Sequence, residues 1–223
     1  MRLSVRALRS VKRMRAARRL LLRRKRSKVN ELRRALAKTR LTHALLAIMI
    51  AVFALELSFP GLLELLAFSP AQSGAHPWTA VTALFAHADL EHIVANLVVL
   101  WFFGLAVEKE LGRKRTGLIF LLGGFAGEAA SALLYDPDVL SLGASAGAFA
   151  LIGAAALVRP FELEAGGGWP MVSPLPLVLL AMVYVGYNLI GVFLGPADIA
   201  YGAHFAGLAA GLAAGWFCRK QRL

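Results

Sequence analysis

Two side chains that could act together in hydrolysis, Ser145 and His204, both lie in apolar surroundings. Ser145 is the centre of the run GASAG (143–147), and His204 is the centre of YGAHFAG (201–207). An ionisable group at membrane depth costs roughly 2.5 kcal/mol or more unless a partner or a cavity serves it, so such groups are functional candidates. A nucleophile and a base placed in this way indicate hydrolysis inside a bilayer.

The composition supports a membrane protein with its charge concentrated at one end. Hydrophobic residues make up 58% of the 223 residues and the mean hydropathy is +0.64, yet the formal net charge is +12. Seventeen of the 25 Lys and Arg residues fall between Arg2 and Arg40, where Glu31 is the only acid. This pattern predicts a basic arm followed by a membrane body. The single cysteine, Cys218, excludes intrachain disulfides and a cysteine-based zinc site.

The basic arm carries apolar residues at a spacing that favours a helix. Leu8, Val11 and Met14 recur among the arginines, which is typical of a basic amphipathic helix on an anionic membrane surface. A mitochondrial transit peptide is the main alternative, because the arm is rich in Arg and poor in acids. Binding to nucleic acid is disfavoured, because no aromatic residues are interleaved with the charges. We expect a cytoplasmic arm at 1–41, a membrane domain at 42–218 and a basic cytoplasmic tail at 219–223.

The membrane domain is predicted to be all-α, a polytopic bundle of six transmembrane helices. The second and fourth apolar segments are shorter than the 20 or so residues that a full crossing needs. We expect these two helices to begin below the surface, where irregular backbone is tolerated beside a watery cavity. The six apolar segments are about 43–59, 92–107, 117–135, 143–158, 171–194 and 199–217.

The remaining basic residues predict the orientation. They follow the second, fourth and sixth segments, whereas the other loops carry only Asp or Glu. Basic loops stay on the cytoplasmic side, so both termini are expected there, in a plasma or inner membrane. The apolar connection 60–91, broken by prolines, is expected to lie at the membrane interface. The basic residues concerned are Lys109, Arg113, Lys114, Arg115, Arg159, Arg219, Lys220 and Arg222.

Four polar side chains are predicted to share one level near the outer surface. His92 and Asn96 are four residues apart, so they share a face where the second segment begins. Ser145 opens the fourth segment, and His204 lies about six residues into the sixth. These segments run in the same direction in the predicted topology, so their polar residues converge on one layer.

A strip of small residues indicates how the serine and the histidine could meet. Gly207, Gly211 and Gly215 follow His204 along one face and allow a neighbouring helix to approach closely. If that neighbour is the fourth segment, which begins with Gly143 and Gly147, Ser145 and His204 can touch.

Six short motifs follow one another between Pro77 and Arg219: PWT (77–79), FAH (85–87), HIVAN (92–96), VEKELG (107–112), GAS (143–145) and AHFAG (203–207). In these motifs and their order the chain resembles the rhomboid family of intramembrane serine proteases. The resemblance implies that Ser145 is the nucleophile and His204 the base. It also implies that His92, Asn96 and the Ser145 backbone N–H form the oxyanion hole, and that Phe149 packs against the histidine. The family usually has Gly directly after the serine, whereas this chain has Ala146.

The predicted activity is therefore peptide-bond hydrolysis in or near the transmembrane helices of single-span substrate proteins. A Ser–His dyad is expected, because Glu128 is the only carboxylate at this depth and should face a polar pocket or the outer cavity. No cluster with metal-ligand spacing is present, so we expect neither a metal nor a cofactor. A catalytically inactive rhomboid-like binding protein is the alternative. A transporter is disfavoured, because the inner halves of the fourth and sixth segments offer no polar path.

Overall fold

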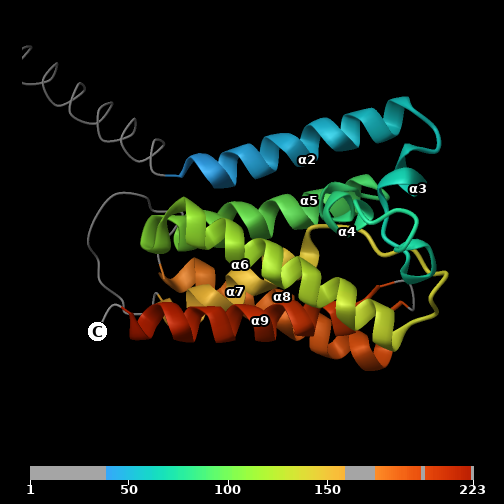
Figure 1. Cartoon of the computed structure of the whole chain (residues 1–223). Coiled ribbons are helices and arrows are strands. Elements are labelled where there is room, and N and C mark those ends of the chain that lie inside the picture. The colour runs from blue at the N-terminus through green and yellow to red at the C-terminus, as the bar shows by residue number, and fades with distance from the viewer. Residues whose placement is uncertain (1–38, 159–173, 197–198, 222–223) are drawn as a thin grey trace, which may run out of the picture. The chain divides into compact units, whose positions relative to one another are not determined.

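A computed structural model describes residues 39–158, 174–196 and 199–221 (Figure 1). Over these ranges the chain is helical and contains no strand, apart from an isolated antiparallel bridge between Phe68 and Ser141. The expected all-α class is therefore confirmed for the described parts. The described residues do not include the segment in which the arm helix is expected. They also do not include Arg159 and Arg222.

The first described helix, α2 (Arg40–Ser58), is held at its start by a carboxylate from elsewhere in the chain. Its N-cap residue Thr39 makes no side-chain capping bond. Instead, the buried Glu108 accepts hydrogen bonds from the Leu41 N–H at 2.9 Å, the Thr42 N–H at 2.8 Å and the Thr42 hydroxyl at 2.7 Å. The first N–H groups of a helix have no acceptor within the helix, so Glu108 supplies one.

The connection after α2 consists of short helical turns. These are α3 (Leu62–Leu66), η1 (Pro70–Gln72), α4 (Thr79–Thr82) and η2 (Ala83–Phe85). Gly61, with a φ of 85°, and the prolines prevent one continuous helix. The apolar side chains of Leu65, Trp78 and Val81 are exposed, as an interfacial segment requires.

Helix α5 (Leu90–Val99), the π-helical turn η3 (Leu100–Gly104) and α6 (Leu105–Leu134) follow one another without a loop. The only break is Gly112, whose φ of 77° and ψ of 167° are not helical. There the chain turns back, so that α5 and α6 run in opposite directions (Figure 1). The gap between the expected segments 92–107 and 117–135 is therefore not a loop: a single glycine makes the turn, because glycine tolerates positive φ.

Helix α7 (Ser145–Val158) is buried between α6 and α9 (Tyr201–Lys220). The glycines of α9 allow this contact. A Cβ at Gly207 would collide with the carbonyl oxygen of Ala146, and one at Gly211 with that of Ala150. The glycine strip predicted from the sequence therefore faces the fourth apolar segment, and the two backbones touch.

Helix α8 (Pro174–Leu194) is attached more loosely and contacts chiefly α9. Most of its large apolar side chains, including Met182, Val183, Ile190 and Phe193, are exposed. Such an apolar surface suits hydrocarbon and not water.

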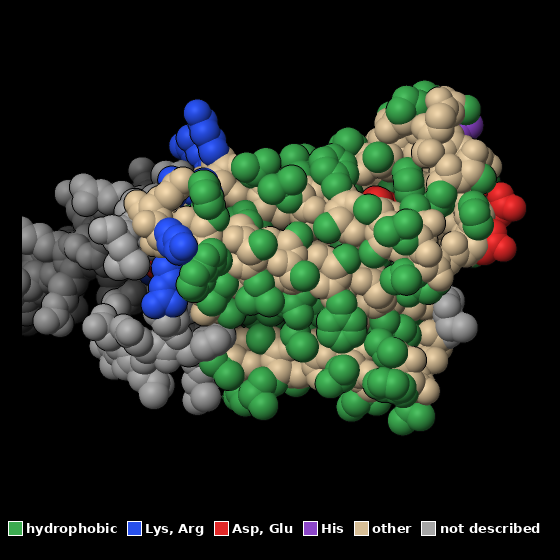
Figure 2. Space-filling view, turned by 60° about the horizontal axis from the view of Figure 1, so that its bottom comes forward, with side chains coloured by type: hydrophobic (Ala, Val, Ile, Leu, Met, Phe, Trp, Pro, Cys, Tyr) green, Lys and Arg blue, Asp and Glu red, His purple; other side chains and the backbone are tan. Residues whose placement is uncertain are grey.

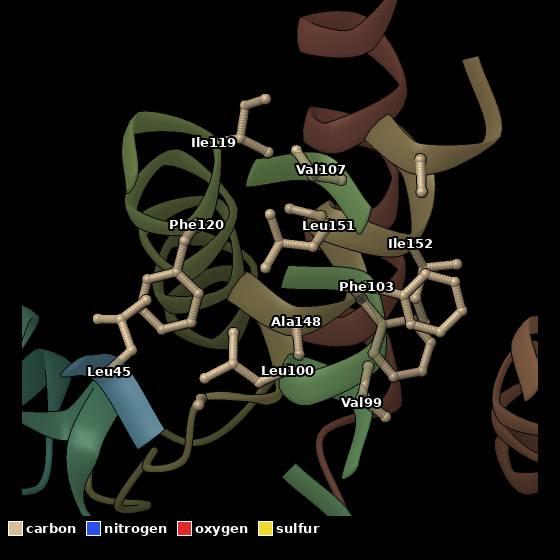
Figure 3. Close-up of a cluster of buried hydrophobic side chains, with 14 of the residues drawn as sticks. Leu45, Val99, Leu100, Phe103, Val107, Ile119, Phe120, Ala148, Leu151 and Ile152 are labelled. Atoms are coloured by element: carbon tan, nitrogen blue, oxygen red, sulfur yellow. The ribbon is translucent and has the colours of Figure 1, made fainter. Parts of the chain in front are cut away.

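The core lies where η3 and α6 meet α7 (Figure 3). Large apolar side chains come from the long helices and from α7, and the alanines of α7 let this helix approach its neighbours closely. The cluster includes Val99, Leu100, Phe103, Val107, Ile119, Phe120, Ala148, Leu151 and Ile152.

Basic and acidic side chains lie at opposite ends of the helix bundle. Figure 2 shows Lys and Arg at one end of the bundle and Asp and Glu at the other, with hydrophobic side chains between them. Three described helices are long and apolar enough to cross a membrane, namely Arg40–Ser58, Leu90–Leu134 and Leu177–Leu194, and Ser145–Val158 is apolar but shorter. This is the surface of a membrane helix bundle.

Candidate active site

Ser145 and His204 are in direct contact. The hydroxyl Oγ of Ser145 lies 2.8 Å from the imidazole Nε2 of His204. Ser145 is the first residue of α7. His204 is in the first turn of α9, because this helix begins at Tyr201. The histidine therefore lies closer to the start of its helix than the six residues expected. The contact follows from the glycine strip, which brings the starts of the two helices together.

The turn before Ser145 depends on Gly143. Its φ is 108°, a conformation that favours glycine, and its N–H donates to the Ala83 carbonyl at 2.8 Å. The turn ends at Ser145, where the first N–H groups of α7 have no acceptor within the helix. A backbone donor is thus available beside the serine hydroxyl.

Two side chains of α5 point at the same turn. A Cβ at Gly143 would lie 2.5 Å from His92 Nε2 and 3.7 Å from Asn96 Nδ2. Asp89 caps α5 by accepting from the His92 N–H at 2.7 Å, and the Asn96 amide donates to the His92 carbonyl at 3.0 Å. The structure therefore brings His92 and Asn96 together with the serine turn.

The imidazole of His204 is held between aromatic rings. Phe149, one turn after Ser145, stacks on it with ring centroids 4.8 Å apart and an interplanar angle of 10°. Tyr201 meets it edge-on, at 6.5 Å and 86°. These contacts fix the plane of the ring so that Nε2 faces the serine.

Comparison with known proteins identifies this arrangement. Residues 74–221 match the family model of the rhomboid domain. The chain belongs to the rhomboid family. This makes it an integral membrane protein, and the resemblance inferred from the motifs is confirmed.

Several rhomboid relatives match parts of the chain. Rhomboid-related protein 2 of Mus musculus is 32% identical over 145 residues, which is 62% of this chain and 47% of that protein. Rhomboid-like protease 3 of Toxoplasma gondii is 38% identical over 87 residues, 39% of this chain and 33% of that protein. RHOMBOID-like protein 6, mitochondrial, of Arabidopsis thaliana is 38% identical over 81 residues, 36% and 26% of the two chains. The matches span a quarter to a half of these relatives.

The alanine that follows the serine in this rhomboid is accommodated by a glycine across the helix contact. A Cβ at Gly127 of α6 would collide with the Cβ of Ala146. Gly127 has none, so the Ala146 methyl occupies that space, and Ala146 is buried. The departure from the usual rhomboid glycine therefore has a steric counterpart on α6.

Sequence reasoning missed Asn188 of α8. Its Oδ1 lies 2.7 Å from His204 Nδ1, and its Nδ2 donates to the Tyr201 carbonyl at 3.3 Å. The side chain is only 1% exposed. A signal was present, because Asn188 is the only amide side chain in the apolar segment 171–194.

The described residues place no carboxylate in a hydrogen bond or ion pair with His204. Glu128 is buried on α6, where its Oε2 has no hydrogen-bonding partner among the described residues. The same residues contain no group of three or more His, Cys, Asp or Glu side chains that could hold a metal ion.

Proposed function

We propose that this rhomboid is a serine endopeptidase that hydrolyses peptide bonds in or near the transmembrane helices of single-span membrane proteins. The observation that carries the proposal is the 2.8 Å contact between Ser145 Oγ and His204 Nε2. A serine hydroxyl is a poor nucleophile until a base takes its proton, and this distance is within the range for that transfer.

The reaction proceeds in two halves. Ser145 Oγ attacks the substrate carbonyl carbon while His204 Nε2 accepts its proton, and the carbonyl electrons move to the oxygen. The intermediate collapses as the C–N bond breaks and His204 returns the proton to the leaving amine. A water molecule, deprotonated by His204, then hydrolyses the acyl ester and regenerates the serine.

The negative charge that develops on the substrate oxygen requires donors that are already in place. We assign this role to the Ser145 N–H, the Asn96 amide and the His92 imidazole. The support is the position of both α5 side chains against Gly143, two residues before the nucleophile. Gly143 leaves them that space, since a Cβ there would meet His92 Nε2.

We also propose six membrane crossings. The stretch Leu90–Leu134 has 45 residues, and at 1.5 Å per residue it is about twice as long as one crossing. Gly112 divides it into two helices. With α2, α7, α8 and α9 the total is six, in a membrane domain of 42–218 flanked by the basic segments 1–41 and 219–223.

The orientation follows from the charges. We propose that the end of the bundle with Lys and Arg in Figure 2 faces the cytoplasm, as do both termini. The site would then open on the other side of a plasma or inner membrane. Single cysteines introduced at Arg115 and Asp136 should then react with an impermeant reagent from opposite sides. Labelling of both from one side would overturn this orientation.

The activity is tested by cleavage of a panel of single-span reporter proteins by the purified protein in lipid. Wild type should cut at least one reporter, and Ser145→Ala should cut none while keeping its thermal stability. If wild type cuts none but binds reporters, the inactive binding protein is the better description. Equal cleavage by Ser145→Ala would refute the proposal.

A further inference from the structure

We propose that Asn188 is a positioning residue that extends the pair into a Ser145–His204–Asn188 chain. This inference rests on the proposed function, because it concerns how His204 acts as the base. The chain is continuous: Ser145 Oγ lies 2.8 Å from His204 Nε2, and His204 Nδ1 lies 2.7 Å from Asn188 Oδ1. Each imidazole nitrogen thus has one partner.

The hydrogen bonds determine which imidazole nitrogen carries the proton. The Tyr201 carbonyl can only accept, so the Asn188 group that faces it is the NH2 group. The other end of the amide, the acceptor Oδ1, must then face the imidazole. An acceptor requires a donor, so Nδ1 carries the proton in neutral His204. Nε2 is left with a lone pair directed at the serine hydroxyl, which is the form that a general base needs.

Packing explains why Asn188 is held in place although α8 makes few contacts. Gly191, three residues later on the same helix, lies against the ring of Tyr201: a Cβ at Gly191 would collide with that ring. The approach that Gly191 permits also brings Asn188 within reach of the Tyr201 carbonyl. Gly186, on the same helix, has nothing within 4 Å of its Cβ position.

A neutral amide is well suited to this position. A carboxylate in the same place would stabilise the imidazolium more strongly, but a charged group at membrane depth carries a large desolvation cost. The amide oxygen accepts the same hydrogen bond without that cost. Asn188 is almost fully buried, so in the folded protein solvent does not compete with His204 for its amide oxygen.

The kinetic test uses purified full-length protein in lipid. Asn188→Leu keeps the approximate shape and removes the acceptor, so kcat should fall about tenfold to a hundredfold, with KM changed less than threefold. Labelling of Ser145 by a fluorophosphonate should slow by the same factor, because it reports the nucleophile without a substrate helix. Gly191→Ala should also lower kcat, by moving α8 away from Tyr201, whereas its matched control Gly186→Ala should equal wild type.

A second measurement does not depend on how the variants fold. In wild-type protein with 15N-labelled histidine, two-bond 1H–15N correlation spectra should show neutral His204 protonated at Nδ1, with the signal assigned through its loss in His204→Gln. Protonation at Nε2 would overturn the inference, as would a folded Asn188→Leu with kcat within threefold of wild type. If Ser145→Ala still cleaves, the proposed function itself fails. If Ser145→Ala is inactive and Asn188→Leu is fully active, only the role of Asn188 fails.

Discussion

The contact between Gly127 and Ala146 offers a sharp test of how the serine is positioned. In Gly127→Ala the new methyl would collide with that of Ala146, the residue directly after the nucleophile. Carbon atoms normally stay about 3.5 to 4.0 Å apart, so α6 and α7 must separate by roughly 1 Å. Overpacking of this kind costs about 1–3 kcal/mol in the free energy of unfolding. A displacement of about 1 Å at a reacting group lowers the rate about a hundredfold.

A second substitution should reverse the effect. Ala146→Gly removes the opposing methyl, so the double variant Gly127→Ala/Ala146→Gly has room for the new one. We expect its turnover to lie within about tenfold of the Ala146→Gly variant, which itself bears a helix cost of about 1 kcal/mol. The assay is reporter cleavage together with thermal unfolding of all four proteins, and Gly186→Ala is the control for a glycine with open space. Wild-type turnover in Gly127→Ala, or no recovery in the double variant, would refute the steric account.

Three further perturbations follow from the structure. Glu108→Ala leaves two backbone N–H groups and the Thr42 hydroxyl without their acceptor. The free energy of unfolding should therefore fall by about 3 kcal/mol, and by less in Glu108→Gln. Equal stability of Glu108→Ala and wild type would contradict this expectation. Burial, and then the charge of His92, lower the pKa of His87 from 6.5 to about 4. The unfolded chain therefore takes up a proton between these pH values that the folded protein does not, and stability should fall by up to about 3 kcal/mol as the pH drops through this window. Thermal unfolding of His87→Leu should lack this part of the pH dependence, and an unchanged slope would assign it to other groups. Asn96→Ala and His92→Ala should each lower kcat about 10²- to 10³-fold with little change in KM; losses below tenfold in both would remove α5 from the oxyanion hole.

The sequence predicts well what depends on long patterns. The apolar segments are visible in the composition alone. The glycine strip of Gly207, Gly211 and Gly215 is visible in the spacing of one segment, whatever the position of that helix in the bundle. The direction of each segment made the convergence of Ser145, His204, His92 and Asn96 predictable as well. All of these follow from periodicity and from the cost of polar groups in hydrocarbon.

Other features depend on geometry that spacing does not carry. Asn188 is a lone amide on an apolar helix, and only the rotation of α8 set by Gly191 and Tyr201 turns it toward His204. The chain reverses at the single residue Gly112, between the predicted segments 92–107 and 117–135, and the apolar pattern does not reveal a positive φ. Glu108 directly follows the second apolar segment in the sequence, and nothing in that pattern indicates that it is buried and caps a helix start 66 positions earlier in the chain. In each case a tertiary contact determines the local structure.

The central claim is that Ser145 is a nucleophile activated by His204, and covalent labelling tests it most directly. Purified protein in lipid is treated with a fluorophosphonate, digested, and the modified peptide is identified by mass spectrometry. We predict modification at Ser145 in wild type and its loss in His204→Gln, in which the overall fold is retained as judged by thermal unfolding. An unmodified Ser145 in wild type, or equal labelling in folded His204→Gln, would contradict the account.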